Sequence, residues 1–198
     1  FQEALDNRKM ASARYQALFQ WKPFNNEMTD WFDPEWMFGV KDGFDIVIGN
    51  PPYVDSEQMT KTMPKERDYY AQHYQCAKGN WDLYIPFWEK SFSLLSNIGR
   101  VCLITPNKWL AIKYGSALRK HLFNYIYNIS DYSSFYAFES ADVSTVIVFA
   151  AKQSSEEICV NIFGDNYIQK SCKMVSKSAI KTFDNLSLCL SNSFDTLN

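Results

Sequence analysis

The chain begins with a helical pattern and then an aromatic, irregular one. Residues 1–20 carry an apolar stripe at helical spacing, which predicts one amphipathic helix. Residues 21–43 gather aromatic side chains among Pro, Asn, Asp and Gly, which is typical of an irregular, packed segment. Phe44–Gly49 is a short, β-branched apolar run, and two prolines follow it at 51 and 52. We therefore expect a buried strand that ends before these prolines and continues into a loop.

Strand and helix patterns alternate beyond this point. In chain order they predict a helix from Trp81 capped by Asn80 and closed by Asn97–Gly99, a strand at Val101–Thr105, a helix over 108–125, and strands at 126–132 and Thr145–Ala151. This alternation indicates βα crossovers and an α/β fold with a mostly parallel sheet and helices on both faces. In such a sheet, ligands bind beyond the carboxyl ends of the strands.

Composition narrows the class of protein. Hydrophobic residues make up 46% and charged residues 21% of the 198, which excludes intrinsic disorder and suits one main core. The apolar run Val143–Ala151 is too short to cross a bilayer. Five cysteines and two histidines form no zinc-ligand pattern, so we expect reduced thiols and no metal site. A net charge of -2 predicts that, if nucleic acid is the substrate, most phosphate contacts lie elsewhere.

The candidate chemistry lies in Asn50-Pro51-Pro52-Tyr53, directly after the predicted strand. Proline has a fixed φ and no amide donor, so this loop is stiff and its carbonyls are free to accept hydrogen bonds. The Asn50 amide oxygen and the Pro51 carbonyl suit one planar amino group, and the Tyr53 ring suits the heterocycle that bears it. The alternative is a mere strand-terminating turn, but its place at the carboxyl end of a strand favours the functional interpretation.

These residues resemble the NPPY-bearing amino-methyltransferases, specifically the adenine-N6 DNA methyltransferases of type IIG restriction-modification enzymes and related phage-defence systems. The resemblance extends from about Trp31 to Lys152. Besides the NPPY motif it rests on four blocks, which begin at Trp31-Phe-Asp-Pro, Gly79-Asn-Trp-Asp, Gly99-Arg-Val-Cys and Val143-Ser-Thr-Val. The resemblance implies a Rossmann-like class I fold, S-adenosylmethionine as cofactor, and the cytoplasm of a prokaryotic cell.

The resemblance also implies roles for individual residues. Asn50 and Pro51 would hold the N6 amine of an adenine flipped out of double-stranded DNA, and Tyr53 would stack on that base. Phe138 would contact the base from another side. The catalytic set is then Asn50, Pro51, Pro52 and Tyr53, the cofactor-binding set Asn50 and Pro52, and the substrate-binding set Tyr53 and Phe138. Asn107 and Lys108 join the substrate-binding set because they stand just past the end of a predicted strand.

One departure from the family changes the expected domain organisation. The seven glycines form no Gly-x-Gly turn, and no strand precedes the first predicted helix. The fold normally begins with such a strand and turn, which cradle the cofactor. We therefore expect residues 1–152 to be the later half of the catalytic domain, with the cofactor-binding half missing, and 153–198 to lead toward a target-recognition domain. An exposed sheet edge would then favour self-association of this fragment.

Several assignments stay open at this point. Asn80 and Asp82 suit either a pocket wall or a helix start, and Lys61, Lys65 and Arg67 suit either DNA phosphate or a solvated loop. Methylation of RNA or of a protein glutamine is an alternative activity, because NPPY and its close variants occur there too. A specificity module that has kept the fold without the activity is a second alternative.

Overall fold

The computed structural model describes residues 2–20, 34–134, 143–180 and 185–190. They fall in two compact units, residues 1–41 and 42–198, each considered by itself. The first unit holds α1 (Gln2–Gln20) and α2 (Pro34–Phe38), where the Tyr15 and Trp36 rings meet edge to face with centroids 5.9 Å apart. The helix expected over residues 1–20 is thus confirmed.

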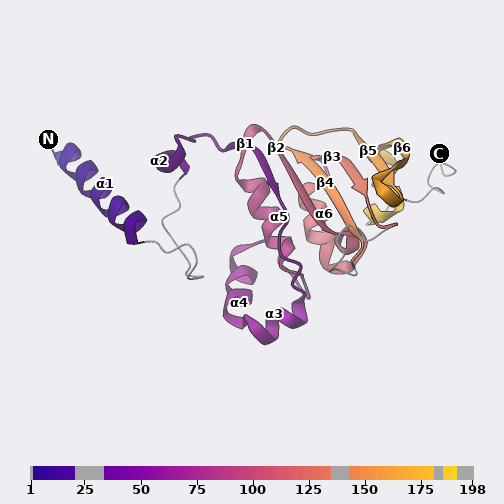
Figure 1. The fold of residues 1–198 in the computed structure, drawn as a ribbon, viewed down its shortest axis with the longest axis horizontal. Coiled ribbons are helices and arrows are strands. Elements are labelled where there is room, and N and C mark those ends of the chain that lie inside the picture. The colour runs from indigo at the N-terminus through magenta and orange to yellow at the C-terminus, as the bar shows by residue number, and fades with distance from the viewer. Residues whose placement is uncertain (1, 21–33, 135–142, 181–184, 191–198) are drawn as a thin grey trace. The chain divides into compact units, whose positions relative to one another are not determined.

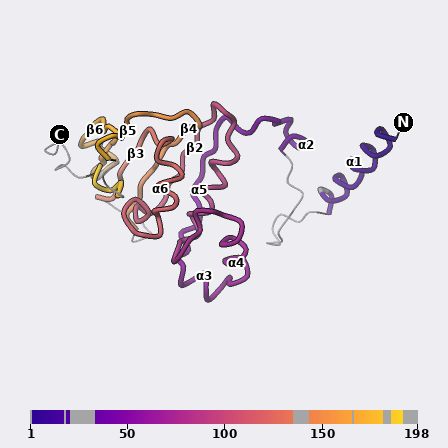
Figure 2. The backbone as a smooth tube through the Cα atoms, turned by 180° about the vertical axis from the view of Figure 1, so that it is seen from behind, coloured from indigo at the N-terminus to yellow at the C-terminus, as the bar shows by residue number. Residues whose placement is uncertain are grey.

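The second unit is built on one six-stranded sheet (Figures 1 and 2). Its elements are β1 (Phe44–Gly49), α3 (Ser56–Thr62), α4 (Pro64–His73), α5 (Tyr84–Ser93), β2 (Leu95–Pro106), two 3-10 turns (Asn107–Leu110 and Lys113–Gly115), α6 (Ser116–Leu122), β3 (Ile126–Asp131), β4 (Thr145–Ala151), β5 (Glu157–Phe163), a 3-10 turn (Asp165–Tyr167), β6 (Gln169–Ser176), α7 (Lys177–Ile180) and a 3-10 turn (Leu186–Leu190).

The strands lie in the order β1-β2-β4-β3-β5-β6. The pairs β1–β2 and β3–β5 are parallel, whereas β4 is antiparallel to both of its neighbours and β6 is antiparallel to β5. Four strands therefore share one direction, as expected of a mostly parallel sheet, and two run against it. Apolar patterning identifies a buried strand but does not encode its direction, which the connections set.

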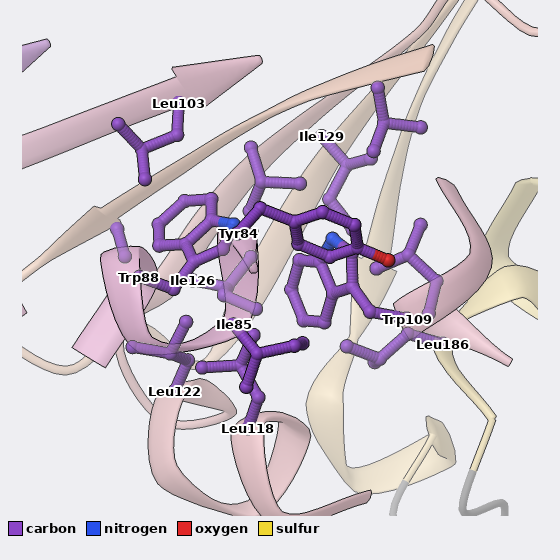
Figure 3. Close-up of a cluster of buried hydrophobic side chains, with 14 of the residues drawn as sticks. Tyr84, Ile85, Trp88, Leu103, Trp109, Leu118, Leu122, Ile126, Ile129 and Leu186 are labelled. Atoms are coloured by element: carbon purple, nitrogen blue, oxygen red, sulfur yellow. The ribbon is translucent and has the colours of Figure 1, made fainter. Parts of the chain in front are cut away.

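One face of the sheet carries the hydrophobic core (Figure 3). The in-register residues Val101, Ala150 and Ile126 are all buried on this face, and so are Leu103, Val148 and Ile129. Helices α5 and α6 cover it: the core residues labelled in Figure 3 are Tyr84, Ile85 and Trp88 from α5, Leu118 and Leu122 from α6, and Leu103, Trp109, Ile126, Ile129 and Leu186.

The opposite face is open among the described residues of this unit. Ile46 and Ile48 of the edge strand β1 are 74% and 77% exposed. On the same face, Cys102 and Phe149 are only half-buried. The expectation of helices on both faces is therefore met on one face within the described residues, and the expected exposed apolar edge is present at β1.

Three further predicted elements differ from the structure. Helix α5 begins at Tyr84, not beside Asn80, which places the buried Pro86 in its first turn. Strand β2 starts at Leu95 and absorbs the residues expected to close that helix. The expected helix over 108–125 is two 3-10 turns followed by α6, and β5 extends the same sheet through β3.

Candidate functional site

The Asn50–Tyr53 loop leaves the sheet at the carboxyl end of β1. The strand pairs in parallel with β2, with Gly49 opposite Leu103. Pro51 is buried, while Asn50 and Pro52 are exposed. Proline cannot donate to the strand ladder, so pairing stops here and the loop stands at the sheet edge where α/β proteins bind ligands.

Tyr53 is anchored to the neighbouring strand. Its hydroxyl donates a hydrogen bond of 3.3 Å to the carbonyl oxygen of Ile104 in β2. The ring is half-buried, and burial raises the pKa of Tyr53 to about 12. The phenol is therefore neutral near pH 7. A ring held in place and kept neutral is suited to stacking on a planar ligand, not to proton transfer.

A network of hydrogen bonds holds the segment that directly follows the Asn50–Tyr53 loop. The amide of Leu83 donates to the Val54 carbonyl at 2.8 Å. The neighbouring Asp82 is buried, and its carboxylate accepts a 2.7 Å hydrogen bond from the Tyr114 hydroxyl, which lies 2.6 Å from the hydroxyl of Tyr84. Burial raises the pKa of both tyrosines, with Asp82 adding to the effect, so both hydroxyls keep their protons. Through Asp82 and its neighbour Leu83, hydrogen bonds therefore connect Val54, directly after the motif, to Tyr114 in the turn before α6.

The end of β2 brings Asn107 and Lys108 to the same edge of the sheet. The Asn107 amide donates to the Ser144 carbonyl at 3.0 Å, and its side-chain nitrogen donates to Ser133 Oγ at 2.9 Å. Asn107 therefore joins the ends of β2, β3 and β4, which is a structural role beside the one predicted. The Lys108 side chain is exposed. Their contact with substrate stays a prediction, and Phe138 lies outside the described residues.

The polar stretch after the motif forms two helices that its sequence pattern did not predict. Asp55 caps α3 by accepting a 2.8 Å hydrogen bond from the Gln58 amide, and Pro64 occupies the first turn of α4. Figure 1 shows both helices beyond the end of β1. Asp55, three residues before Gln58, and Pro64, nine residues after Asp55, are local helix-start signals that were available in the sequence.

Two of the basic residues in these helices are engaged within the fold. Arg67 donates to Ser56 Oγ at 3.0 Å and to the Gly79 carbonyl at 3.1 Å, and its guanidinium lies 5.2 Å from the Trp81 ring centroid. Lys61 pairs with Glu57 at 2.6 Å. They help to line a cavity of about 480 Å³, together with Asp55, Asn80 and Asp82. Arg67 is thus a structural residue in addition to any DNA contact.

The described residues hold few alternatives to this site. No three His, Cys, Asp or Glu side chains among them gather closely enough to bind a metal ion. No helix in the same part of the chain is both long and apolar enough to cross a membrane.

Comparison with known proteins relates this site to restriction-modification methylases. The chain is 31% identical over 115 residues to the type II restriction enzyme and methyltransferase RM.Eco57I of Escherichia coli, covering 57% of this chain and 12% of that enzyme. It is 40% identical over 76 residues to the type II methyltransferase M.PaeR7I of Pseudomonas aeruginosa, covering 38% of this chain and 13% of that protein. The chain thus spans about an eighth of each relative's length.

Structural similarity extends over more of the chain. The crystal structure of a type I restriction-modification methyltransferase subunit from Streptococcus thermophilus superposes with a TM-score of 0.53 at 17% identity, covering 83% of this chain and 42% of that one. The sheet is therefore that of a methyltransferase fold. The model of the Eco57I restriction-modification methylase family matches residues 1–143. As the sequence resemblance indicated, the chain belongs to the Eco57I restriction-modification methylase family.

Proposed function

We propose that this chain carries the target-base half of an adenine-N6 DNA methyltransferase that uses S-adenosylmethionine. The observation that carries the proposal is the Asn50–Tyr53 loop at the carboxyl end of β1, with the Tyr53 ring fixed against β2. Membership of a restriction-modification methylase family supports DNA as the substrate.

The loop supplies what an aromatic amine needs in order to react. Its lone pair is delocalised into the ring, so the amine is a poor nucleophile. Acceptor oxygens at Asn50 and Pro51 favour the pyramidal geometry that localises the lone pair on nitrogen. Attack then begins without a general base, which suits a motif that has no Asp, Glu or His.

Tyr53 holds the base outside the duplex. An enzyme that modifies a base must flip it from the stack, which costs a few kcal/mol. Stacking on an aromatic ring contributes about 1 to 3 kcal/mol in return. Because the Tyr53 hydroxyl is bound to Ile104, its ring is oriented before the base arrives. Phe138 is proposed to contact the base from another side.

The cofactor fits this chain only at its reactive end. S-adenosylmethionine, when bound, supplies the methyl group, and the exposed side chains of Asn50 and Pro52 are the residues proposed to border it. The backbone donors of a glycine-rich turn are not in this sequence. We expect the 198-residue chain alone to bind S-adenosylmethionine with a dissociation constant weaker than about 1 mM by calorimetry, and a micromolar constant would contradict this domain assignment.

The domain assignment predicts what lies against β1. Ile46 and Ile48 make an apolar strand at the sheet edge, which in a longer protein would be covered by the cofactor-binding strands and helices. In the isolated chain this edge is proposed to drive self-association. Residues 153–198 are proposed to lead toward the target-recognition domain, although β5 and β6 first extend the catalytic sheet.

A transfer assay with three substrate classes tests the proposal. The longer protein that contains this chain is incubated with S-adenosylmethionine labelled in the methyl group and with duplex DNA, RNA or a protein extract. We expect label in duplex DNA only. Label in RNA or protein alone would identify the alternative methyltransferases, and specific DNA binding without transfer would identify a non-enzymatic specificity module.

A further inference from the structure

A second cavity, of about 720 Å³, lies beside the cavity next to α3. The two cavities differ in the charge of the side chains that line them. Three lysines line it, namely Lys78, Lys113 and Lys120. The other polar residues around it are Asn80, Tyr114 and Ser116, and no carboxylate lines it. The cavity beside α3, in contrast, has three carboxylates against one lysine and one arginine. In a sequence with 22 acidic and 20 basic residues, this is a local concentration of positive charge.

The three lysines come from three segments that meet at this cavity, two of them loops and one a helix. Lys78 precedes α5, while Lys113 and Lys120 come from the turn after β2 and from α6. All three side chains are exposed. The two salt bridges recorded for the described residues use other lysines, Lys41 and Lys61. The ammonium groups therefore remain available to an external anion.

The wall of this cavity is held rigidly. Arg119 is 4% exposed and donates to the carbonyls of Trp109 at 2.6 Å and Ile112 at 2.9 Å. This guanidinium is committed to the turn that presents Lys113. Gly115 packs so closely on Trp109 that a Cβ there would lie 2.1 Å from the Trp109 carbonyl oxygen. The lysines thus stand on a fixed scaffold.

Hydrogen bonds join this cavity to the target-base loop. Asn80 lines both cavities. Tyr114, on the basic side, donates to Asp82, and the next residue, Leu83, donates to the Val54 carbonyl beside Tyr53. A ligand that places a base on Tyr53 therefore finds the lysine cluster on the same supported edge of the sheet.

We propose that Lys78, Lys113 and Lys120 bind backbone phosphate of the DNA strand that carries the target adenine. This inference rests on the proposed function. It adds a binding site for the backbone of the DNA strand from which the adenine is flipped. A nucleic-acid strand carries one phosphate per 3.4 Å of helix rise, so a cluster of ammonium groups beside a flipped base faces phosphate and not another base. Lysine suits this role because it contacts phosphate as a point charge without reading sequence.

The test compares two double variants of the longer protein by fluorescence anisotropy on labelled duplexes. Lys113→Gln with Lys120→Gln removes two of the lysines, whereas Lys90→Gln with Lys170→Gln removes the same charge from exposed positions outside the cavity. Each phosphate contact contributes about 0.9 to the slope of log K against log salt concentration. We expect that slope to fall by about 1 to 2 in the cavity variant and to stay unchanged in the control.

Four outcomes separate this inference from the proposed function. Equal weakening of cognate and unrelated duplexes, with turnover at saturating DNA kept within about twofold, supports phosphate anchoring. A wild-type slope in the cavity variant of a protein that does methylate DNA overturns the anchor alone. If inorganic phosphate binds the wild type through these lysines but, at equal ionic strength, displaces the duplex no better than chloride does, the cavity is a free-phosphate site and the proposal is wrong. A wild-type protein that neither binds nor methylates duplex DNA overturns the proposed function itself.

Discussion

The hydroxyl of Tyr53 donates to the carbonyl oxygen of Ile104 at 3.3 Å, so the loop after β1 is fastened to the neighbouring parallel strand. Ile104 lies three residues before Asn107, which in turn joins the ends of β3 and β4 through Ser133 and Ser144. The aromatic residue of the motif is thereby connected to three strand ends. Its position is set by the sheet and not by the loop alone.

Replacing Tyr53 by Phe is expected to keep most of the methyl transfer, because a ring remains and only the bond to Ile104 is lost. Replacing it by Ala removes the stacking, worth about 1 to 3 kcal/mol, and should lower transfer about 5- to 150-fold. Single-turnover rates and DNA affinity of the longer protein measure both effects. An Ala variant that matches the wild type in both would remove Tyr53 from the site.

The Tyr114→Phe substitution is expected to lower the free energy of unfolding by about 1 to 3 kcal/mol, because the buried Asp82 carboxylate loses a donor. Urea unfolding of the 198-residue chain, followed by tryptophan fluorescence, measures the change. Tyr69→Phe is the matched control, since that ring is 45% exposed. Equal stability of the two variants would show that the Asp82 network does not stabilise the loop.

Lys177 gives the fold a pH dependence. Its side chain is buried, and its ammonium donates to the Asn124 carbonyl at 2.8 Å. Burial lowers the pKa of Lys177 from 10.5 to about 8, and the nearby Glu156 carboxylate opposes part of this shift. Between pH 8 and 10.5 the unfolded chain keeps a proton that the folded chain has lost. Lys177 therefore costs stability below pH 8, and this cost disappears as the pH rises through that window.

Comparison with Lys177→Met isolates this effect from the tyrosines, which titrate in both proteins. The free energy of unfolding of the wild type, relative to the Met variant, should rise between pH 7.5 and 10.5 by an amount on the order of 1 kcal/mol. The measurement is urea unfolding at several pH values. A difference that stays constant or falls across this range would show that the ammonium is not desolvated in the fold.

The sequence predicted the elements whose ends carry the site. β1, residues 101–105 of β2, and β4 were predicted, because a β-branched run bounded by proline, glycine or a polar turn has few other conformations. β3 was predicted from a weaker pattern, since polar residues interrupt its apolar positions. The motif itself follows directly from residues 50–53. The direction of β4 did not follow, since a strand inserted between two parallel neighbours depends on long-range pairing that no local pattern records.

The support of the site was harder to predict than the site itself. Tyr114 lies 30 residues after Tyr84 and 32 residues after Asp82. Only the packing of α5 against α6 brings it to them. The lysine cluster has the same origin, because Lys78 and Lys113 belong to different loops. The helices α3 and α4 lack a continuous apolar face, so their local caps were the only signal.

The central claim is that Asn50 acts on the amine of an adenine. The most direct measurement is mass spectrometry of nucleosides from unmethylated duplex DNA, sampled over time during incubation with S-adenosylmethionine and the longer protein, as wild type or as Asn50→Ala. We expect N6-methyladenine in the wild type and a loss on the order of 100-fold in initial rate for the variant, because an oriented acceptor of the reacting group is removed while the exposed side chain leaves the core untouched. Methylation of another base, or more than about a tenth of the wild-type rate in the variant, would contradict the account.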